Sequence, residues 1–491
     1  MIAIQTEFRP AIPNVYGAAD YREFRDTLEH MDKALRAGLA EDLVQGWLGK
    51  WESDRDSVAS PGRLAFMWKY AHYVLRCNIA RHLMGLSFRD FSIRLADSEL
   101  LQWFCAINIF GQRKAVSKSS LERFDKWFEV PDVERVIRVL LSDLQEPEKA
   151  RTLAGQEEAI RLDEIFADTT CVKANMHYPV DWVLLRDATR SLIAAIVTIR
   201  RQGLKHRMPE PREFVTRINR HCIQMTHNRR RKDSRKYRKQ VLREMKKLSK
   251  LVQNHGERYR DLLQRRWQET AWTEKQAQVV IGRIDNILEK LPKAIKQAHE
   301  RIIGGRRVAN EAKILSLYDE DIHVLVRGKT GAEVEFGNGL YLAEQRDGLI
   351  VDWELFKDQP PADTRLVKRS VARMAKLFGD VVSGYGGDRG FDSKTNARYL
   401  DEHKIFNAIC PKSPKELIAR IKEPRFAEMQ RRRGQTEARI GIFKNSYLGR
   451  PLRNKGFEHK RNTVAWCVLT HNLWVLARMK IASEQQQREA A

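Results

Sequence analysis

Three charged side chains in the stretch RRRGQTEARIGIFKN, residues 431–445, have spacings that place them on one face of a helix. Arg433 and Glu437 are four residues apart, and Lys444 follows Glu437 by seven, so all three share one stripe. A carboxylate between two cations suits a site that holds a metal ion beside a phosphate. Taken alone, the pattern also describes a solvated ion pair on a charged helix, which is the commoner arrangement.

Two aspartates upstream each follow a strand-like run, Asp168 in EIFADTT and Asp388 in DVVSGYGGDRGFDS. We predict that each ends its strand, where a carboxylate projects over the edge of the sheet. Two such aspartates and a glutamate on a later helix form the carboxylate set that a two-metal phosphoryl-transfer site requires. Asp163, Glu164 and Asp392 are competing carboxylates that physical reasoning alone does not exclude.

These blocks resemble those of the DDE transposases of bacterial insertion sequences. The resemblance is to the branch whose last catalytic block carries an Arg-x-x-x-Glu-x-x-x-x-x-x-Lys signature, here Arg433, Glu437 and Lys444 with the spacing intact. Gln430 stands where the family usually has Tyr. DTTCVKANMHYPVD, which begins at Asp168, is similar to the first-Asp block of the family, and GGDRGFDSKTN is similar to its second-Asp block. Three blocks in the right order are a more specific signal than any one of them.

The resemblance covers roughly residues 160–478, with weaker similarity from about residue 67 to 128. It implies an RNase H-like catalytic domain in an α+β multidomain chain. The implied activity is that of a transposase, which binds the ends of a mobile DNA element and catalyses metal-dependent phosphodiester cleavage and strand transfer. A non-catalytic DNA-binding protein derived from a transposase, or a related DDE nuclease without strand transfer, is the alternative.

The resemblance also implies the cofactors, the partners and the role of each site residue. Two Mg²⁺ (or Mn²⁺) ions are expected, because hard cations take oxygen ligands. The expected partner is double-stranded DNA bound by a homodimer, with no nucleotide cofactor. The implied metal ligands and catalytic residues are Asp168, Asp388 and Glu437, and the implied phosphate-binding residues are Arg433, Lys444 and Arg389.

The composition predicts a soluble chain with a polyanionic partner. A formal charge of +25 and a pI of about 9.8 point to nucleic acid. The six cysteines are isolated, which favours a reducing compartment and argues against structural zinc. The N-terminus has no apolar signal region, and the apolar run of residues 463–476 is too short to span a membrane. We therefore expect a cytoplasmic, nucleoid-associated bacterial protein with no membrane partner.

We divide the chain into five parts by composition and hydrophobic period. The expected parts are an N-terminal helical segment (1–60), a helix-turn-helix-like DNA-binding domain with its connector (61–159), a catalytic domain (160–190 and 311–478), a basic helical-hairpin insertion (191–310) and a polar tail (479–491), of which residues 484–491 are expected to be disordered.

Short helices are predicted between residues 61 and 130, with starts at Ser87 and Ser98. The basic linker GQRKAVSKSS leads into a last helix over residues 121–128. This pattern is typical of a helix-turn-helix, although an ordinary helical bundle would look similar. The DNA contacts would then be Lys114, Lys118, Ser119, Ser120 and Arg123.

A seven-residue apolar pattern from Val241 to Leu262 and a second one from Val280 to Ile302, broken near Pro292, predict an antiparallel helical hairpin. The cations before and along the first helix form either a solvated face or a surface that tracks phosphates. The candidate phosphate contacts are Arg229, Arg230, Arg231, Arg235 and Lys236.

After Lys313 the period changes to that of strands, in the runs ILSLYDED, HVLVRG, AEVEFGN, GLYLAEQ and GLIVDWELF. A helix over 363–378, a strand over 380–386, a helix over 396–404 and a strand over 406–410 are expected next. The order β, insertion, ββ, α, β, α, β, α fits the RNase H-like fold that the resemblance implies.

Overall fold

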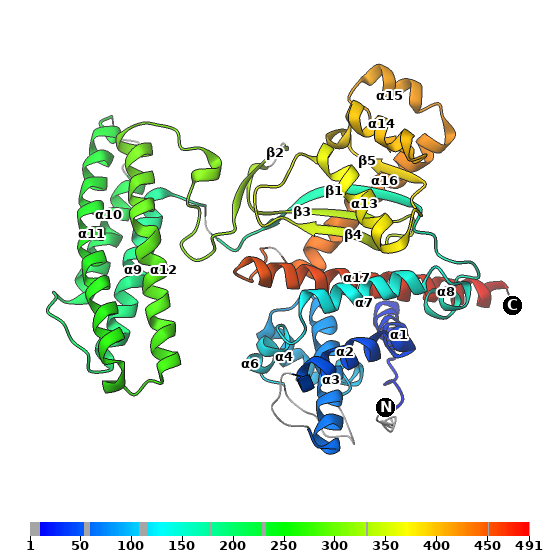
Figure 1. Cartoon of the computed structure of the whole chain (residues 1–491), viewed down its shortest axis with the longest axis horizontal. Coiled ribbons are helices and arrows are strands. Elements are labelled where there is room, and N and C mark those ends of the chain that lie inside the picture. The colour runs from blue at the N-terminus through cyan, green and yellow to red at the C-terminus, as the bar shows by residue number, and fades with distance from the viewer. Residues whose placement is uncertain are drawn as a thin grey trace. The chain divides into compact units, whose positions relative to one another are not determined.

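The computed structural model describes residues 10–53, 59–107, 116–176, 178–227, 232–329, 332–449 and 451–490. The chain divides into two compact units, of which unit 1 comprises residues 1–173 and 338–491 and unit 2 comprises residues 174–337. Both units are mainly helical, and one mixed sheet contains the strands (Figure 1). Within the described ranges, no helix has the length and apolarity needed to cross a membrane.

The sheet has the strand order β2-β3-β1-β5-β6, where β2 is His323–Lys329, and β4 also pairs with β3. Strands β1, β5 and β6 are parallel, whereas β3 and β4 are antiparallel to each other. The bounds are β1 Glu164–Lys173, β3 Ala332–Glu344, β4 Ile350–Leu355, β5 Gly384–Gly387 and β6 Phe406–Ile409.

Helices follow β4, β5 and β6, as the hydrophobic period predicts. Their bounds are α13 Leu366–Phe378, α14 Lys394–Glu402, α15 Pro414–Arg420 and α16 Pro424–Ile442, which continues into the π-helical turn η8 Phe443–Leu448. The mixed α+β class is confirmed.

The number of strands in the middle of the chain was predicted wrongly. AEVEFGN and GLYLAEQ join into the single strand β3, and ILSLYDED forms no strand. The chain stays extended through Gly339 because its carbonyl accepts a hydrogen bond from Phe356 N at 2.9 Å. A Cβ at Gly339 would lie 2.8 Å from the Pro360 ring, so only glycine allows this close approach.

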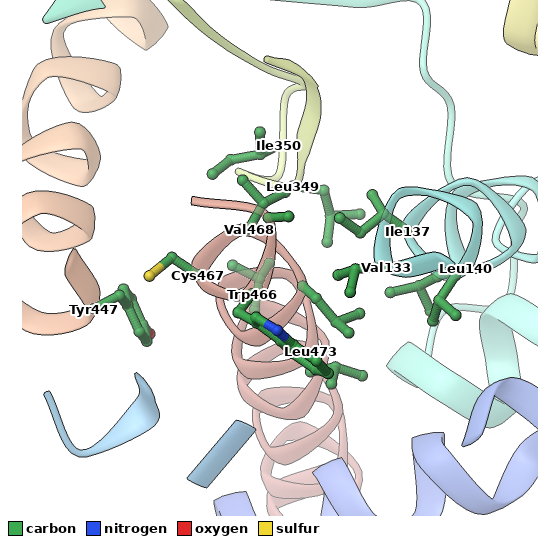
Figure 2. Close-up of a cluster of buried hydrophobic side chains, with 14 of the residues drawn as sticks. Val133, Ile137, Leu140, Leu349, Ile350, Tyr447, Trp466, Cys467, Val468 and Leu473 are labelled. Carbon is green, nitrogen blue, oxygen red and sulfur yellow. The ribbon is translucent and has the colours of Figure 1, made fainter. Parts of the chain in front are cut away.

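Helix α17, Phe457–Ala490, lies at the centre of unit 1 and buries the apolar run that was predicted to pack on the sheet. It packs against β4 and against the helices α1 Ala19–Ala34, α3 Pro61–Leu83, α7 Val130–Asp143 and α8 Pro147–Ala154. Figure 2 shows one cluster that gathers Trp466 and Leu473 of α17 with Val133 of α7, Leu349 and Tyr447. The expected parts 1–60 and 61–159 therefore share one core with the sheet, because both bury their apolar faces against α17.

The polar tail was expected to be disordered over residues 484–491, but α17 continues to Ala490. Lys480 Nζ donates to the carbonyl of Arg151 at 3.0 Å, and Ser483 Oγ donates to the carbonyl of Gly155 at 2.8 Å. These bonds attach α17 to the end of α8 just before the segment that was expected to be disordered.

Serine caps begin three short helices of the N-terminal region, as the sequence indicates for the first two. Ser87, Ser98 and Ser117 each accept a hydrogen bond from the backbone N–H three residues later. The helices that they begin are α4 Phe88–Asp97, α5 Glu99–Phe104 and α6 Lys118–Phe124, preceded by α2 Ala40–Ser53. Helix α6 starts and ends earlier than the predicted range of 121–128 because Ser117 caps it.

Unit 2 is a bundle of four helices rather than a hairpin. Helices α11 Ser234–Arg266 and α12 Glu274–Ala298 are the predicted pair, and α9 Asp181–Arg201 and α10 Pro211–His227 share their core. In the same unit, β2 His323–Lys329 pairs with the first half of β3. The insertion therefore extends over 174–337 instead of 191–310. Residues 174–190 and 311–337, which were assigned to the catalytic part, belong to unit 2.

Pro292 does not break α12, which continues to Ala298. A proline inside a helix removes one backbone hydrogen bond and usually kinks the helix. Here Pro292 is exposed, while Leu291 and Ile295 beside it are buried in the bundle core. Their packing keeps the chain helical across the proline.

Candidate functional site

Asp168, on β1, and Asp388, directly after β5, occupy equivalent positions in the register of these neighbouring parallel strands. The last paired residues of β1 and β5 are Phe166 and Gly386, and each aspartate lies two residues beyond its member of that pair. Adjacent strands are ~4.8 Å apart, so the backbones of the two aspartates lie side by side at the carboxyl end of β5. Strand β1 does not end at Asp168 as predicted but continues to Lys173, beyond its pairing with β5.

Both aspartates lie on the face of the sheet that α16 covers. Phe166 and Asp168 share a face because side chains alternate along a strand. Phe166 is fully buried and packs with Phe426 and Met429 of α16. A Cβ at Gly386 would lie 3.0 Å from the Phe166 ring, so a glycine on β5 makes room for this ring.

The charged stripe of α16 continues from these buried residues. Arg433 follows Met429 by four residues, and its Nη1 lies 3.3 Å from Glu437 Oε1, as the spacing predicts. The Glu437 side chain is 65% exposed. Lys444, in η8, donates from Nζ to Thr170 Oγ1 at 2.7 Å, two residues beyond Asp168 on β1. The helix stripe and the first-Asp strand are thus in direct contact.

Gln430 connects Arg433 to the sheet. Its Nε2 donates to the carbonyl of Ala408 on β6 at 2.5 Å. Its Oε1 accepts from Arg433 Nε at 3.3 Å. The residue that departs from the family signature therefore holds the guanidinium of Arg433 in place.

A buried ion cluster fixes the rotation of α16 about its axis. Glu344, at the end of β3, accepts from Arg432 Nη1 at 2.8 Å and from Thr436 Oγ1 at 2.7 Å, and Arg439 Nη1 lies 3.6 Å away. Burial lowers the pKa of the Arg432 guanidinium, although Glu344 acts in the opposite direction. With these residues turned toward β3, Arg433 and Glu437 lie on a different side of α16 from the buried ion cluster.

Each of the three competing carboxylates contacts a partner in the protein. Asp163 lies five residues before Asp168, about 16 Å away along an extended strand, and accepts from Ser383 Oγ at 3.3 Å. Glu164 lies 3.6 Å from the Arg425 guanidinium. Asp392 accepts from the Lys412 backbone N–H at 2.8 Å. Asp168 and Asp388 also accept backbone N–H groups, and what distinguishes this pair is the strand register that places them level with each other.

Asp363 is a carboxylate near the site that the sequence did not single out. A Cβ at Gly390 would lie 2.6 Å from Asp363 Oδ2 and 2.9 Å from Asp388 Oδ1, so the two carboxylates flank the same glycine. Asp363 starts a 3₁₀ turn ahead of α13, which the turn after Asp388 contacts. No local pattern could have revealed this, because the two aspartates meet only through tertiary packing.

The oxygen ligands available suit a hard divalent cation, but they are not gathered around one point. Asp168 Oδ1 accepts the N–H of Thr169 at 2.7 Å, Asp388 Oδ1 accepts the N–H of Gly390 at 2.8 Å, and Glu437 is held by Arg433. Within the described ranges, no three His, Cys, Asp or Glu side chains are close enough to hold a metal ion. The neighbouring aspartates fit Mg²⁺ by chemistry and placement, whereas ligation by Glu437 stays a prediction.

The remaining predicted contacts are scattered over the chain. Arg389 is exposed directly after Asp388. On α6, Lys118, Ser119 and Arg123 are exposed, and Arg123 Nη2 donates to Ser120 Oγ at 3.1 Å. Arg235 and Lys236 are exposed at the start of α11. Lys114, Arg229, Arg230 and Arg231 lie outside the described residues.

Comparisons of the chain with protein-family models, with curated proteins and with solved structures found no match. The functional argument therefore depends on the geometry of the site and on the sequence motifs.

Proposed function

We propose that this protein is a DNA transposase that binds the ends of a mobile DNA element and catalyses metal-dependent cleavage and strand transfer. The proposal is carried by the equivalent placement of Asp168 and Asp388 on parallel strands beneath the helix with Arg433 and Glu437. An RNase H-like catalytic fold is part of the proposal. The order β1, insertion, β3, β4, α13, β5, α14, β6, α16 supports it.

The site residues divide into metal ligands and phosphate ligands. Two Mg²⁺ (or Mn²⁺) ions, when bound, would supply an activated nucleophile and stabilise the leaving oxygen. Asp168 and Asp388 would hold them together with Glu437. Arg433 suits a bidentate contact to a DNA phosphate, and Lys444 suits a point contact. The bond from Lys444 to Thr170 holds this cation beside the first-Asp strand.

Double-stranded DNA is the proposed partner, bound by a homodimer in the bacterial cytoplasm. The net charge of +25 supports a polyanionic ligand. The exposed Lys118, Ser119 and Arg123 on the capped helix α6 support a contact between DNA and this helix. Because α6 belongs to the shared core of unit 1, recognition by this helix is proposed for the whole chain and not for a separate domain.

The test is an in vitro cleavage and joining assay with the full chain, Mg²⁺ and labelled duplexes taken from the DNA that flanks the coding region. We expect cleavage with 3′-OH ends and joined products for the unaltered protein. Asp168→Asn, Asp388→Asn and Glu437→Gln should each abolish both products while leaving DNA binding largely unchanged. The matched control is Asp163→Asn, which removes a carboxylate from the opposite end of β1.

A fully active Asp388→Asn protein would refute the assignment of the site. Cleavage without joined products would identify a nuclease of the same kind. One observation favours a non-catalytic DNA-binding protein, namely that Glu437 is paired with Arg433 rather than directed to the aspartates. DNA binding without any cleavage would support that alternative.

A further inference from the structure

The positive charge of this protein is concentrated in unit 2. Residues 174–337 contain 36 of the 89 Lys and Arg residues but only 19 of the 64 Asp and Glu residues, which gives +17 of the total +25. Unit 2 is about a third of the chain. An excess of this size in one helical bundle exceeds what solubility requires and indicates a polyanionic ligand.

Four cations form a continuous line on the first half of α11, and we call Lys236, Arg243, Lys247 and Lys250 the basic stripe. All four are exposed. With 3.6 residues per turn, they fall within about 60° of arc around the helix. The apolar residues of the same half, such as Met245, are buried in the bundle core.

The basic stripe is poorly neutralised, in contrast to the second half of α11. Lys247 lies 3.2 Å from Glu244, but within the described part of the chain no carboxylate pairs with Lys236, Arg243 or Lys250. In the second half, by comparison, Arg260 pairs with Asp285 at 3.0 Å, and Arg266 pairs with Glu269.

Two further features of α11 indicate repulsion among its cations in the free protein. Asp233 precedes α11 at the N-cap, and the charged residues of the first turn itself, Arg235 and Lys236, are both cations, where the helix dipole favours anions. Burial lowers the pKa of Lys246, and repulsion from Lys250 and Arg243 lowers it further. A bound polyanion would relieve both effects.

We propose that the basic stripe binds the phosphate backbone of duplex DNA without reading its sequence. From Lys236 to Lys250 the helix rises ~21 Å, which matches about six base pairs at 3.4 Å each. An anionic membrane is a poorer fit, because the apolar face of α11 is buried in the bundle. The choice of DNA as the polyanion rests on the proposed function.

The test compares two full-length variants with equal loss of charge. In the stripe variant, Lys236, Arg243, Lys247 and Lys250 are replaced by Gln. In the control variant, the exposed Arg258, Arg265, Arg266 and Lys275 of the opposite end of the bundle are replaced by Gln. The readout is the affinity for an unrelated duplex of about 30 base pairs between 50 and 300 mM KCl, with thermal unfolding to verify folding.

We expect the stripe variant to reduce the slope of log affinity against log salt by about 3.6, because each lost phosphate contact removes about 0.9. The control variant should change the slope by less than about 1. Equal slopes in the parent and the stripe variant, or equal losses in both variants, would overturn the proposal. Loss of binding to phosphatidylserine vesicles with DNA affinity unchanged would also overturn it.

The same measurements separate this proposal from the proposed catalytic function. Asp168→Asn should keep the full salt slope of the parent, because it does not touch the stripe. If the stripe variant still cleaves DNA at low salt and keeps the salt slope of the parent, the DNA-binding role of the stripe is refuted and the catalytic function is not. If the slope depends on the stripe but the parent protein never cleaves DNA, the catalytic function is refuted and the DNA-binding role of the stripe is not.

Discussion

Lys444 Nζ donates a 2.7 Å hydrogen bond to Thr170 Oγ1 and so connects the end of the α16 stripe to the strand that carries Asp168. Thr170 is buried and Lys444 is half-buried, so this contact is held away from bulk water. It joins residues 274 positions apart in the chain. This bond therefore contributes to the position of Lys444 relative to Asp168.

Replacement of Thr170 by Val should reduce cleavage of element-end DNA about ten-fold or more. Valine keeps the shape but removes the acceptor, and a hydrogen bond to a charged group is worth about 1.5–3 kcal/mol. Thr170→Ser retains the hydroxyl and should stay close to the parent. Single-turnover cleavage rates of the two variants provide the measurement, and equal rates would mean that the bond does not position Lys444.

Replacement of Gln430 by Leu should weaken DNA binding through Arg433. The variant removes the hydrogen bond that Gln430 donates to the carbonyl of Ala408 and the hydrogen bond that it accepts from Arg433 Nε. A double-mutant cycle with Arg433→Gln measures the coupling, which should be about 0.5–3 kcal/mol in binding free energy. Additive effects of the two substitutions on affinity would show that Gln430 acts on stability alone.

Acid should destabilise unit 1 through two buried histidines, His82 and His471. Burial lowers the pKa of both imidazoles, and Arg81 lowers that of His82 further. Cys467 Sγ lies 3.2 Å from His82 Nδ1, and His471 Nε2 lies 3.0 Å from the carbonyl of Gly348. Both side chains are therefore neutral in the folded protein near neutral pH.

In the unfolded chain a histidine titrates near pH ~6.5, so below that pH the unfolded state binds more protons than the folded state. The contribution of the two neutral histidines to the free energy of unfolding should thus be complete above pH ~6.5, and the free energy of unfolding should fall as the pH drops below that value. Urea unfolding at pH 7.5, 6.5 and 5.5 measures this dependence. The double variant His82→Gln, His471→Gln should be less stable than the parent, and its free energy of unfolding should vary less with pH. If that variation is the same as in the parent, other groups cause the loss of stability in acid.

Cys410 should be the one reactive thiol of the native protein. All six cysteines lie within the described residues, and the other five are buried. Burial raises the pKa of the thiols of Cys222 and Cys467, and the hydrogen bond with Cys105 together with burial raises the pKa of Cys77, which suppresses the reaction of all three. Cys410 follows Ile409, the partner of Gly387, and is therefore level with Asp388 at the edge of the sheet.

We expect one equivalent of Ellman's reagent to react rapidly with the folded protein, and Cys410→Ser to abolish this reaction. Element-end DNA should slow the labelling of Cys410, because the proposed DNA site includes the same edge of the sheet. Rapid labelling that is indifferent to saturating DNA would place the DNA elsewhere. Reaction of several thiols at similar rates would contradict the burial of the other five.

The sequence by itself determined the features that depend on neighbours along the chain. The Arg433–Glu437 ion pair follows from a spacing of four residues on a helix. Ser87 and Ser98 cap their helices through a backbone N–H three residues away. The apolar period of α11 and the excess of cations are likewise visible in the residues alone.

Only the tertiary structure decided which distant residues meet. The register of β1 on β5 places Asp168 level with Asp388, and no local pattern encodes that register. Asp363 comes to lie beside Asp388 in the same way. Helix α17 gathers the N-terminal helices into one core with the sheet, and α9 and α10 turn a hairpin into a bundle. These outcomes depend on the burial of apolar faces between segments far apart in sequence, which is a property of the whole fold.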